Sequence, residues 1–194
     1  MARPLVSPLV PGRNLVLIGL MGSGKSTVGR MVAARLDRPF VDTDAVVEAE
    51  LGMSVAEVFA SQGERAFRAA EAQAIRHVSA LRGQVVAVGG GAVVAQDNVR
   101  HLKATGDVVL LQAEPAELAA RVAAAGVETR PLLADSGDVE ARLGALLAAR
   151  ADAYRDAADV TLETGGRTAT EVVDDLLAWA VRQPGLLARE EIPA

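Results

Sequence analysis

Cysteine is absent from this chain of 194 residues, and aromatic residues make up only 3% of it. Without cysteine the protein can have no disulfide framework, no thiol nucleophile and no cysteine-ligated metal. Since disulfides belong to oxidising compartments, a cytoplasmic location is the default expectation. The chain is nevertheless 51% hydrophobic, so its core should consist of aliphatic rather than aromatic side chains.

The sequence also lacks an uninterrupted apolar segment long enough to cross a membrane. Its longest candidate, residues 85–95, is interrupted by three glycines and falls short of the roughly 20 residues of a spanning helix. Residues 1–14 contain scattered prolines but no continuous apolar segment, so we expect no signal peptide. A net charge of −5 argues against a surface that coats nucleic acid. The sequence therefore predicts a soluble single domain without membrane or nucleic-acid partners.

Lysine is rare, and its position is informative. Only two of the 20 basic residues are lysines, Lys25 and Lys103, and the other 18 are arginines. Lys25 lies in residues 19–27, GLMGSGKST, which follow an apolar run and match the spacing G-x-x-x-x-G-K-[ST]. Glycines let backbone N–H groups wrap around a phosphate, a helix start adds its positive dipole end, and Ser26 offers Mg²⁺ a hydroxyl. The spacing indicates a phosphate-binding loop; the alternative is a plain glycine turn before an amphipathic helix.

Apolar runs and helical patterns alternate along the whole chain. The pattern predicts helices over residues 26–36, 45–51, 64–81, 97–106 and 138–154, with further helices opening at residues 54, 114 and 168. Strands are predicted over residues 14–18, 38–41, 85–88, 108–111 and 160–162. Such alternation is typical of parallel strands joined by right-handed crossovers, and hence of a layered α/β domain.

Three polar or glycine-rich segments each follow a predicted strand directly. They are residues 19–26, 42–44 and 89–91, and ligands collect at the carboxyl ends of parallel strands. We therefore expect all three segments to meet in one crevice. The glycines at 89–91 either let the backbone approach a ligand closely or form an ordinary turn.

Asp42 and Asp44 are the candidate acidic residues of that crevice. If the second strand continues through both, their alternate parity points both carboxylates the same way. Asp42 could then face a metal while Asp44 reaches an acceptor hydroxyl. The alternative is that the Asp-Thr-Asp cluster caps the following helix.

Taken together, these motifs resemble shikimate kinase. The resemblance covers about residues 14 to 182, in the family's order, and it rests on GLMGSGKST at 19–27, Asp-Thr-Asp at 42–44, Phe67-Arg68, Gly-Gly-Gly at 89–91, Arg130-Pro131-Leu132-Leu133, and Arg150 with Tyr154. It implies a three-layer α/β/α P-loop kinase fold with a five-stranded parallel sheet. It also implies a substrate-binding helical region near residues 45–75 and a lid near 123–137. A leader at 1–13 and a tail at 183–194 lie outside it.

The resemblance implies transfer of the ATP γ-phosphate to the 3-hydroxyl of shikimate, in aromatic amino-acid biosynthesis, with Mg²⁺ and by a monomer. Asp44 would contact the shikimate hydroxyls and is the candidate general base, acting with Lys25 and Arg130. Asp42, through water, and Ser26 would hold Mg²⁺. The phosphates would be bound by Gly22, Ser23, Gly24, Lys25, Ser26 and Thr27.

Four arginines complete the site that the resemblance implies. Arg68 and Arg150 would hold the shikimate carboxylate, beside the amides of Gly89, Gly90 and Gly91. Arg130, on the lid, would reach the phosphates, and Arg167 matches a position near the adenine. Guanidinium forks suit carboxylates, although solvated helix faces are the alternative for Arg68 and Arg150.

The sequence departs from the family between Arg121 and Arg130, where the spacing is wider than in the family. Either the lid is longer and Arg121 still packs against the adenine, or that contact is lost. Two other functions are also compatible with the sequence. One is a kinase of the same fold that acts on another small alcohol such as gluconate. The other is a nucleotide-dependent switch, although the Asn-Lys-x-Asp motif of guanine-specific switches is absent.

Overall fold

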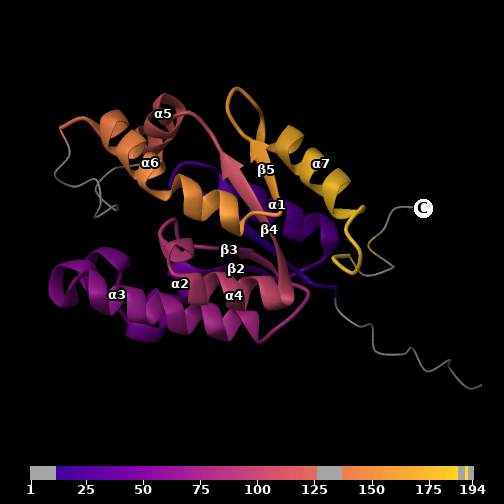
Figure 1. Cartoon of the computed structure of the whole chain (residues 1–194), viewed down its shortest axis with the longest axis horizontal. Helices are drawn as coiled ribbons and strands as arrows, with labels where there is room; N and C mark the ends of the chain where they lie inside the picture. The colour runs from indigo at the N-terminus through magenta and orange to yellow at the C-terminus, as the bar shows by residue number, and fades with distance from the viewer. Residues whose placement is uncertain (1–11, 126–136, 188–190, 192–194) are drawn as a thin grey trace, which may run out of the picture.

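The computed structural model describes residues 12–125, 137–187 and 191. Its centre is a five-stranded sheet with the strand order β2-β3-β1-β4-β5 (Figure 1). Every neighbouring pair is parallel, so crossovers join the strands. This confirms the predicted parallel sheet. The strands are β1 (Asn14–Ile18), β2 (Phe40–Asp42), β3 (Val85–Ala87), β4 (Gly106–Gln112) and β5 (Val160–Glu163).

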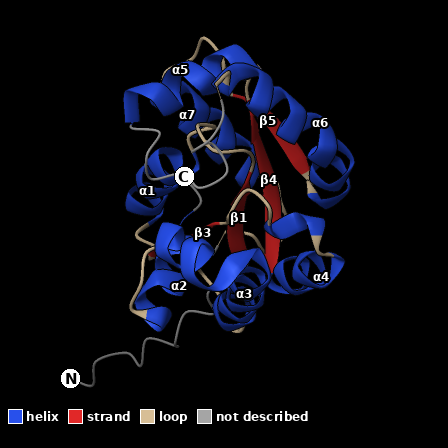
Figure 2. Cartoon of the chain, turned by 90° about the vertical axis from the view of Figure 1, so that its left-hand side faces the viewer, coloured by secondary structure: helices blue, strands red, loops and turns tan. Residues whose placement is uncertain are grey.

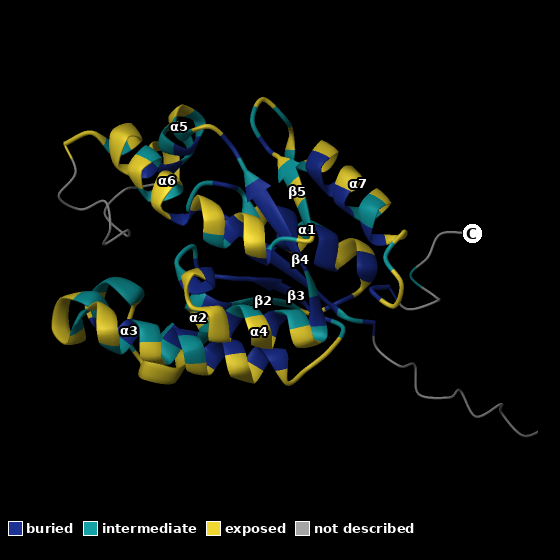
Figure 3. Ribbon diagram, viewed as in Figure 1, coloured by how far each residue is buried: buried dark blue, intermediate teal, exposed yellow. Residues whose placement is uncertain are grey.

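Helices cover both faces of the sheet and make three layers (Figure 2). They are α1 (Lys25–Leu36), α2 (Thr43–Leu51), α3 (Val55–Ser79), α4 (Gln96–Thr105), α5 (Pro115–Ala125), α6 (Val139–Ala157) and α7 (Ala169–Ala180). Side chains of β1 alternate between the faces. Leu15 and Leu17 pack with α1 and α7, whereas Val16 and Ile18 pack with α3, α4 and α6. The predicted three-layer architecture is therefore confirmed, with a mostly aliphatic core (Figure 3).

The segment of residues 42–44 does not extend the second strand. β2 ends at Asp42 and α2 begins at Thr43. The cause is a helix cap, since Asp42 Oδ1 accepts a hydrogen bond from the Asp44 N–H at 3.2 Å. The prediction that strand parity aligns the two carboxylates is therefore wrong. A strand end presents Asp42, and the first helical turn presents Asp44.

Two further boundaries differ from the predicted ones. The helix that opens after Ser54 and the predicted helix over 64–81 are joined in α3, which kinks at Gly63, where φ is 81° and ψ is 171°. The predicted capping box of Ser54 and Glu57 is present.

A short 3-10 helix, η1 (Ala92–Val94), follows the triple glycine and was not predicted. Among the residues described, none of the helices has the length and apolarity that crossing a bilayer requires.

The tail, to which the sequence assigned no role, contributes to the core. Leu186 is fully buried and packs in the same cluster as α1 and α7. The guanidinium group of Arg38 donates to the Leu186 carbonyl at 2.8 Å and to the two carboxylate oxygens of Glu191 at 2.5 and 2.6 Å. The Arg38 side chain is only 4% exposed. These hydrogen bonds hold Leu186 and Glu191 beside the amino end of β2, away from the carboxyl ends of the strands.

Candidate active site

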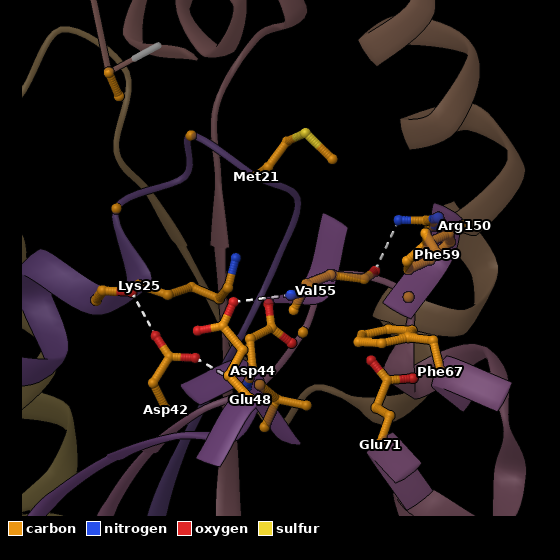
Figure 4. Close-up of a pocket in the computed structure, with 18 of the residues that line it drawn as sticks. Met21, Lys25, Asp42, Asp44, Glu48, Val55, Phe59, Phe67, Glu71 and Arg150 are labelled. Carbon is orange, nitrogen blue, oxygen red and sulfur yellow. Dashed lines mark hydrogen bonds between the residues drawn. The ribbon is translucent and has the colours of Figure 1, made fainter. Parts of the chain in front are cut away.

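A cavity of about 590 Å³ lies at the carboxyl ends of the central strands (Figure 4). Its wall includes residues from all three segments that were expected to converge, and that prediction is confirmed. Of the predicted site residues, those lining the cavity are Gly22, Gly24, Lys25, Ser26, Thr27, Asp42, Asp44, Arg68, Gly89, Gly90, Gly91 and Arg150.

The loop between β1 and α1 has the conformation that a phosphate cradle needs. Gly19, Gly22 and Gly24 have φ values of 140°, 81° and 95°, and residues other than glycine rarely adopt such values. Lys25 opens α1, and its ammonium group donates to the carbonyls of Gly19 at 2.8 Å and Leu20 at 3.0 Å. The helix start and the lysine thus place positive charge at one end of the cavity.

Ser26 and Asp42 place two oxygen ligands side by side. Ser26 Oγ donates to Asp42 Oδ2 at 2.9 Å. Within the described ranges, no group of three or more His, Cys, Asp or Glu side chains could hold a metal ion. This donor set fits Mg²⁺, which takes few protein ligands and completes its shell with water and substrate phosphates. A site of this kind suits a metal that arrives with a nucleotide.

Asp44 lines the cavity, and one of its two carboxylate oxygens lacks a hydrogen-bond partner within the described part of the chain. Its Oδ1 is buried, and no described residue donates to it. Burial raises the pKa of Asp44, the nearby Asp42 carboxylate raises it further, and the charge of Lys25 opposes both. Because Asp44 lines the cavity, its carboxylate is available to a hydroxyl group of a ligand.

Arg68 is held over the triple glycine by two acids of its own helix. Its Nη1 donates to Glu71 Oε2 and its Nη2 donates to Glu64 Oε1, each at 2.9 Å. A Cβ atom on Gly91 would lie 2.6 Å from Arg68 Nη2, so glycine is what lets the guanidinium group approach the backbone. The second glycine of the run, Gly90, contacts Arg150 of α6 instead.

Arg150 and Tyr154, one turn apart on α6, both donate to the Gly90 carbonyl, at 3.0 and 2.6 Å. The structure thus brings Arg68 and Arg150 onto neighbouring glycines of one turn. The Gly89 N–H is already used, because it donates to Thr43 Oγ1 at 3.1 Å. Any amide contact to a ligand therefore falls to Gly90 and Gly91.

Sequence reasoning did not assign a role to several cavity residues. Glu71, of which 1% is exposed, is the partner of Arg68, and its spacing of three residues from Arg68 on a predicted helix was the available signal. Phe59 and Phe67 form an apolar wall, with ring centroids 4.8 Å apart. Phenylalanine occurs only three times in the sequence, so two in one predicted helical region could have indicated a ligand wall.

The other residues that the sequence singled out differ in their position relative to the cavity. Ser23 is buried and does not line the cavity. Arg121 lines the cavity and donates to the Gly22 carbonyl at 3.3 Å. Arg167 is not part of the lining, and it pairs with Asp175 of α7 at 2.7 Å. Arg130 and most of the expected lid lie outside the described residues.

Comparisons with known proteins agree with this geometry. The family described as "Shikimate kinase" matches residues 21–181. A shikimate kinase of Symbiobacterium thermophilum is 48% identical over 84% of this chain and 94% of its own length. One of Geobacter sulfurreducens is 44% identical over 87% of this chain and 91% of its own.

Solved structures give the same result. Shikimate kinase from Acinetobacter baumannii, in complex with shikimate, has a TM-score of 0.82 and 34% identity, over 86% of this chain and 92% of that chain. A gluconokinase from Sinorhizobium meliloti, at 18% identity with a TM-score of 0.51, shares the fold alone, over 87% of this chain and 90% of its own. The chain therefore belongs to the shikimate kinase family, and it is a kinase that transfers a phosphoryl group to an alcohol.

Proposed function

We propose that this protein transfers the γ-phosphoryl group of ATP to the 3-hydroxyl of shikimate, with Mg²⁺, in aromatic amino-acid biosynthesis. One observation carries the proposal. Arg68 and Arg150 meet on the turn of Gly90 and Gly91, in the same cavity as Lys25. A relative of the same fold has been solved with shikimate bound, which supports this acceptor over gluconate.

The two guanidinium groups are suited to the carboxylate of the acceptor. Planar forks of N–H donors bind carboxylates with two parallel hydrogen bonds. Arg68 reaches the glycine turn from α3 and Arg150 reaches it from α6, so the carboxylate would be held between two helices. The rings of Phe59 and Phe67 would pack against the apolar carbons of the acceptor.

The opposite end of the cavity is suited to the triphosphate. Gly22, Ser23, Gly24, Lys25, Ser26 and Thr27 would bind its phosphates through backbone N–H groups and the Lys25 ammonium. Ser26 and, through water, Asp42 would hold Mg²⁺, which neutralises charge on the phosphates when it is bound. The 2.9 Å contact between Ser26 and Asp42 already places these donors together.

Asp44 stands between the two ends and would act on the attacking hydroxyl. Its carboxylate, which lines the cavity, would accept a hydrogen bond from the 3-hydroxyl of the acceptor. As the oxygen of the 3-hydroxyl bonds to the γ-phosphorus and the bond between that phosphorus and ADP breaks, the hydroxyl proton passes to the Asp44 carboxylate. Positioning supplies most of the rate enhancement in phosphoryl transfer, so Asp44 serves both to orient the hydroxyl and to take its proton.

The other parts of the proposal rest on the sequence resemblance alone. Arg130 would reach the phosphates from the lid after ATP binds. Arg167 would lie near the adenine once nucleotide is present. We also infer a cytoplasmic monomer.

A coupled assay of ADP release tests the proposal. The purified protein is given ATP and Mg²⁺ with shikimate, gluconate or a nucleoside monophosphate in turn. We expect shikimate alone to stimulate ADP release, with shikimate 3-phosphate as the product. Equal stimulation by gluconate, or no response to any of the three, would contradict the proposed acceptor.

A further inference from the structure

Helix α5 holds the turn after β5 with an acid and a base that are one helical turn apart. Glu117 Oε1 accepts a hydrogen bond from the Gly166 N–H at 2.7 Å. Arg121 donates to the Thr164 carbonyl at 2.6 Å and to the Thr164 hydroxyl at 2.9 Å. Residues four apart lie on the same helix face, so the turn of residues 164–166 is fastened to α5 at both of its ends.

The glycine at position 165 fits the Glu117 carboxylate closely. A Cβ atom on Gly165 would lie 2.1 Å from Glu117 Oε2 and 3.0 Å from Glu117 Cδ. Gly165 does not have a left-handed φ, whereas Gly166 does, at 61°. The absence of a side chain at 165 is therefore explained by the approach of Glu117 and not by backbone conformation.

The contacts of Glu117 and Arg121 with the turn of residues 164–166 continue to the phosphate-loop end of the cavity. The guanidinium group of Arg121 that holds Thr164 also donates to the Gly22 carbonyl of the phosphate loop at 3.3 Å. Arg121 and Ala125 line the cavity on this side. The proposed acceptor site lies on the other side, at Arg68 and Arg150, so we expect a nucleotide whose phosphates occupy the loop to extend its nucleoside toward α5.

We propose that Glu117 is a positioning residue for nucleotide binding. By holding the Gly166 N–H, it fixes the turn of residues 164–166, and through Thr164 it fixes the Arg121 side chain against the phosphate loop. The inference rests on the proposed function only in that the protein uses a nucleoside triphosphate. It does not depend on which acceptor is phosphorylated.

A purely structural role for Glu117 would have a different signature. Loss of a surface hydrogen bond that only supports the fold lowers the melting temperature and leaves the ratio of the two substrate KM values unchanged. A positioning role changes the affinity for nucleotide and leaves the KM for the acceptor unchanged. The two roles are separated by measuring both substrates and thermal stability in the same variants.

The test compares Glu117→Ala with Glu117→Gln and with the control Glu114→Gln. Glu114 is exposed and lies just before α5. Calorimetry measures ADP binding without acceptor, and steady-state kinetics give the KM for ATP and for shikimate. In Glu117→Ala we expect about a three- to tenfold loss of ADP affinity and a matching rise in the KM for ATP, from loss of a charge-assisted hydrogen bond. In Glu117→Gln, whose side-chain carbonyl still accepts from Gly166, most of the affinity should return.

A second variant tests the close approach directly. Gly165→Ala should displace the Glu117 carboxylate and weaken ADP binding as Glu117→Ala does, and the double variant should lose little more than either single one. Unchanged ADP affinity in Glu117→Ala, an equal loss in Glu114→Gln, or full additivity in the double variant would overturn the inference. If the wild type ignored shikimate while Glu117→Ala still weakened ADP binding, the inference would stand and the proposed acceptor would fail.

Discussion

The Arg68 guanidinium group and the Glu71 carboxylate form an ion pair at 2.9 Å in which the acid is 1% exposed and the base is 30% exposed. The acid therefore lies beneath the base and supports it from the protein side. A second acid, Glu64, holds Arg68 from the solvent side. Because the side chain is already ordered, little conformational entropy is lost when Arg68 binds a carboxylate.

Replacing Arg68 with alanine should remove acceptor binding and spare nucleotide binding. Loss of a charged fork at a carboxylate predicts about a hundredfold or greater fall in kcat/KM for shikimate. ADP affinity, measured by calorimetry, should stay within about twofold of wild type. Arg65→Ala, an exposed arginine of the same helix, is the matched control. Equal effects on shikimate and ADP would argue against a carboxylate-binding role.

Glu71 should give the protein a stability that depends on pH. Burial raises the pKa of Glu71, and the ion pair with Arg68 offsets only part of that rise. The folded state then binds a proton more tightly than the unfolded state, so Glu71 should lower stability as pH rises from the ordinary glutamate pKa to the raised one. Urea unfolding of Glu71→Gln across this range should show a smaller decline, because only the part due to the raised pKa of Asp44 remains, whereas Glu64→Gln, on the exposed side of Arg68, should keep the full decline. Parallel curves for wild type and Glu71→Gln would contradict the raised pKa.

Asp44→Asn should retain the fold and ATP affinity and lose phosphoryl transfer. The amide is nearly isosteric, but it cannot take the hydroxyl proton, and general-base contributions are typically about 10²- to 10⁴-fold. Single-turnover measurement of shikimate 3-phosphate formation isolates this step. Asp97→Asn, at an aspartate whose side chain is 77% exposed and which does not line the cavity, is the matched control and should leave the rate unchanged. A near-normal rate in Asp44→Asn would exclude Asp44 as the base.

The phosphate loop and the converging strand ends could be predicted because each depends on local sequence. The glycine spacing before Lys25 dictates its own backbone, and parallel topology brings successive strand ends together. The relation of Asp42 to Asp44 could not be read in the same way. Both a strand and a helix cap fit Asp-Thr-Asp, and the hydrogen bond from the Asp44 N–H to Asp42 determined which formed. The sequence therefore identified these residues but not their geometry.

Contacts between distant segments were the other features that the sequence could not supply. Leu186 and Glu191 lie in a segment whose composition does not distinguish it from an ordinary polar tail. Their hydrogen bonds are made with Arg38, about 150 positions earlier in the chain. Likewise, the approach of Glu117 to Gly165 joins two elements that are far apart in sequence. Neither contact has a periodicity or a spacing by which it could be recognised.

Gly91→Ala should damage the site and leave the fold intact. The added Cβ would lie 2.6 Å from Arg68 Nη2 and 2.8 Å from Arg68 Cζ, which are the far end of a flexible side chain. The guanidinium group can move away at little cost in stability, but it then leaves its position over the turn. We expect a rise of about tenfold in the KM for shikimate with an unchanged melting temperature. Gly144→Ala, where a Cβ would make only ordinary contacts with Pro115 at 3.8 Å or more, should leave the KM unchanged, and a normal KM in Gly91→Ala would show that the turn tolerates a side chain.

Leu186→Ala should show that the tail is part of the folded domain. Leu186 is fully buried in the cluster that includes α1 and α7, and truncating a buried leucine costs about 2 to 5 kcal/mol, because transfer free energy is lost and a cavity is left. Equilibrium unfolding in urea should therefore give a lower midpoint with a similar slope. Leu81→Ala, at a leucine that is 54% exposed, should change the free energy of unfolding by less than about 0.5 kcal/mol. Because the tail lies away from the carboxyl ends of the strands, where the cavity is, kcat/KM for shikimate should be unchanged at temperatures where Leu186→Ala remains folded, and equal stability of the two leucine variants would place the tail outside the core.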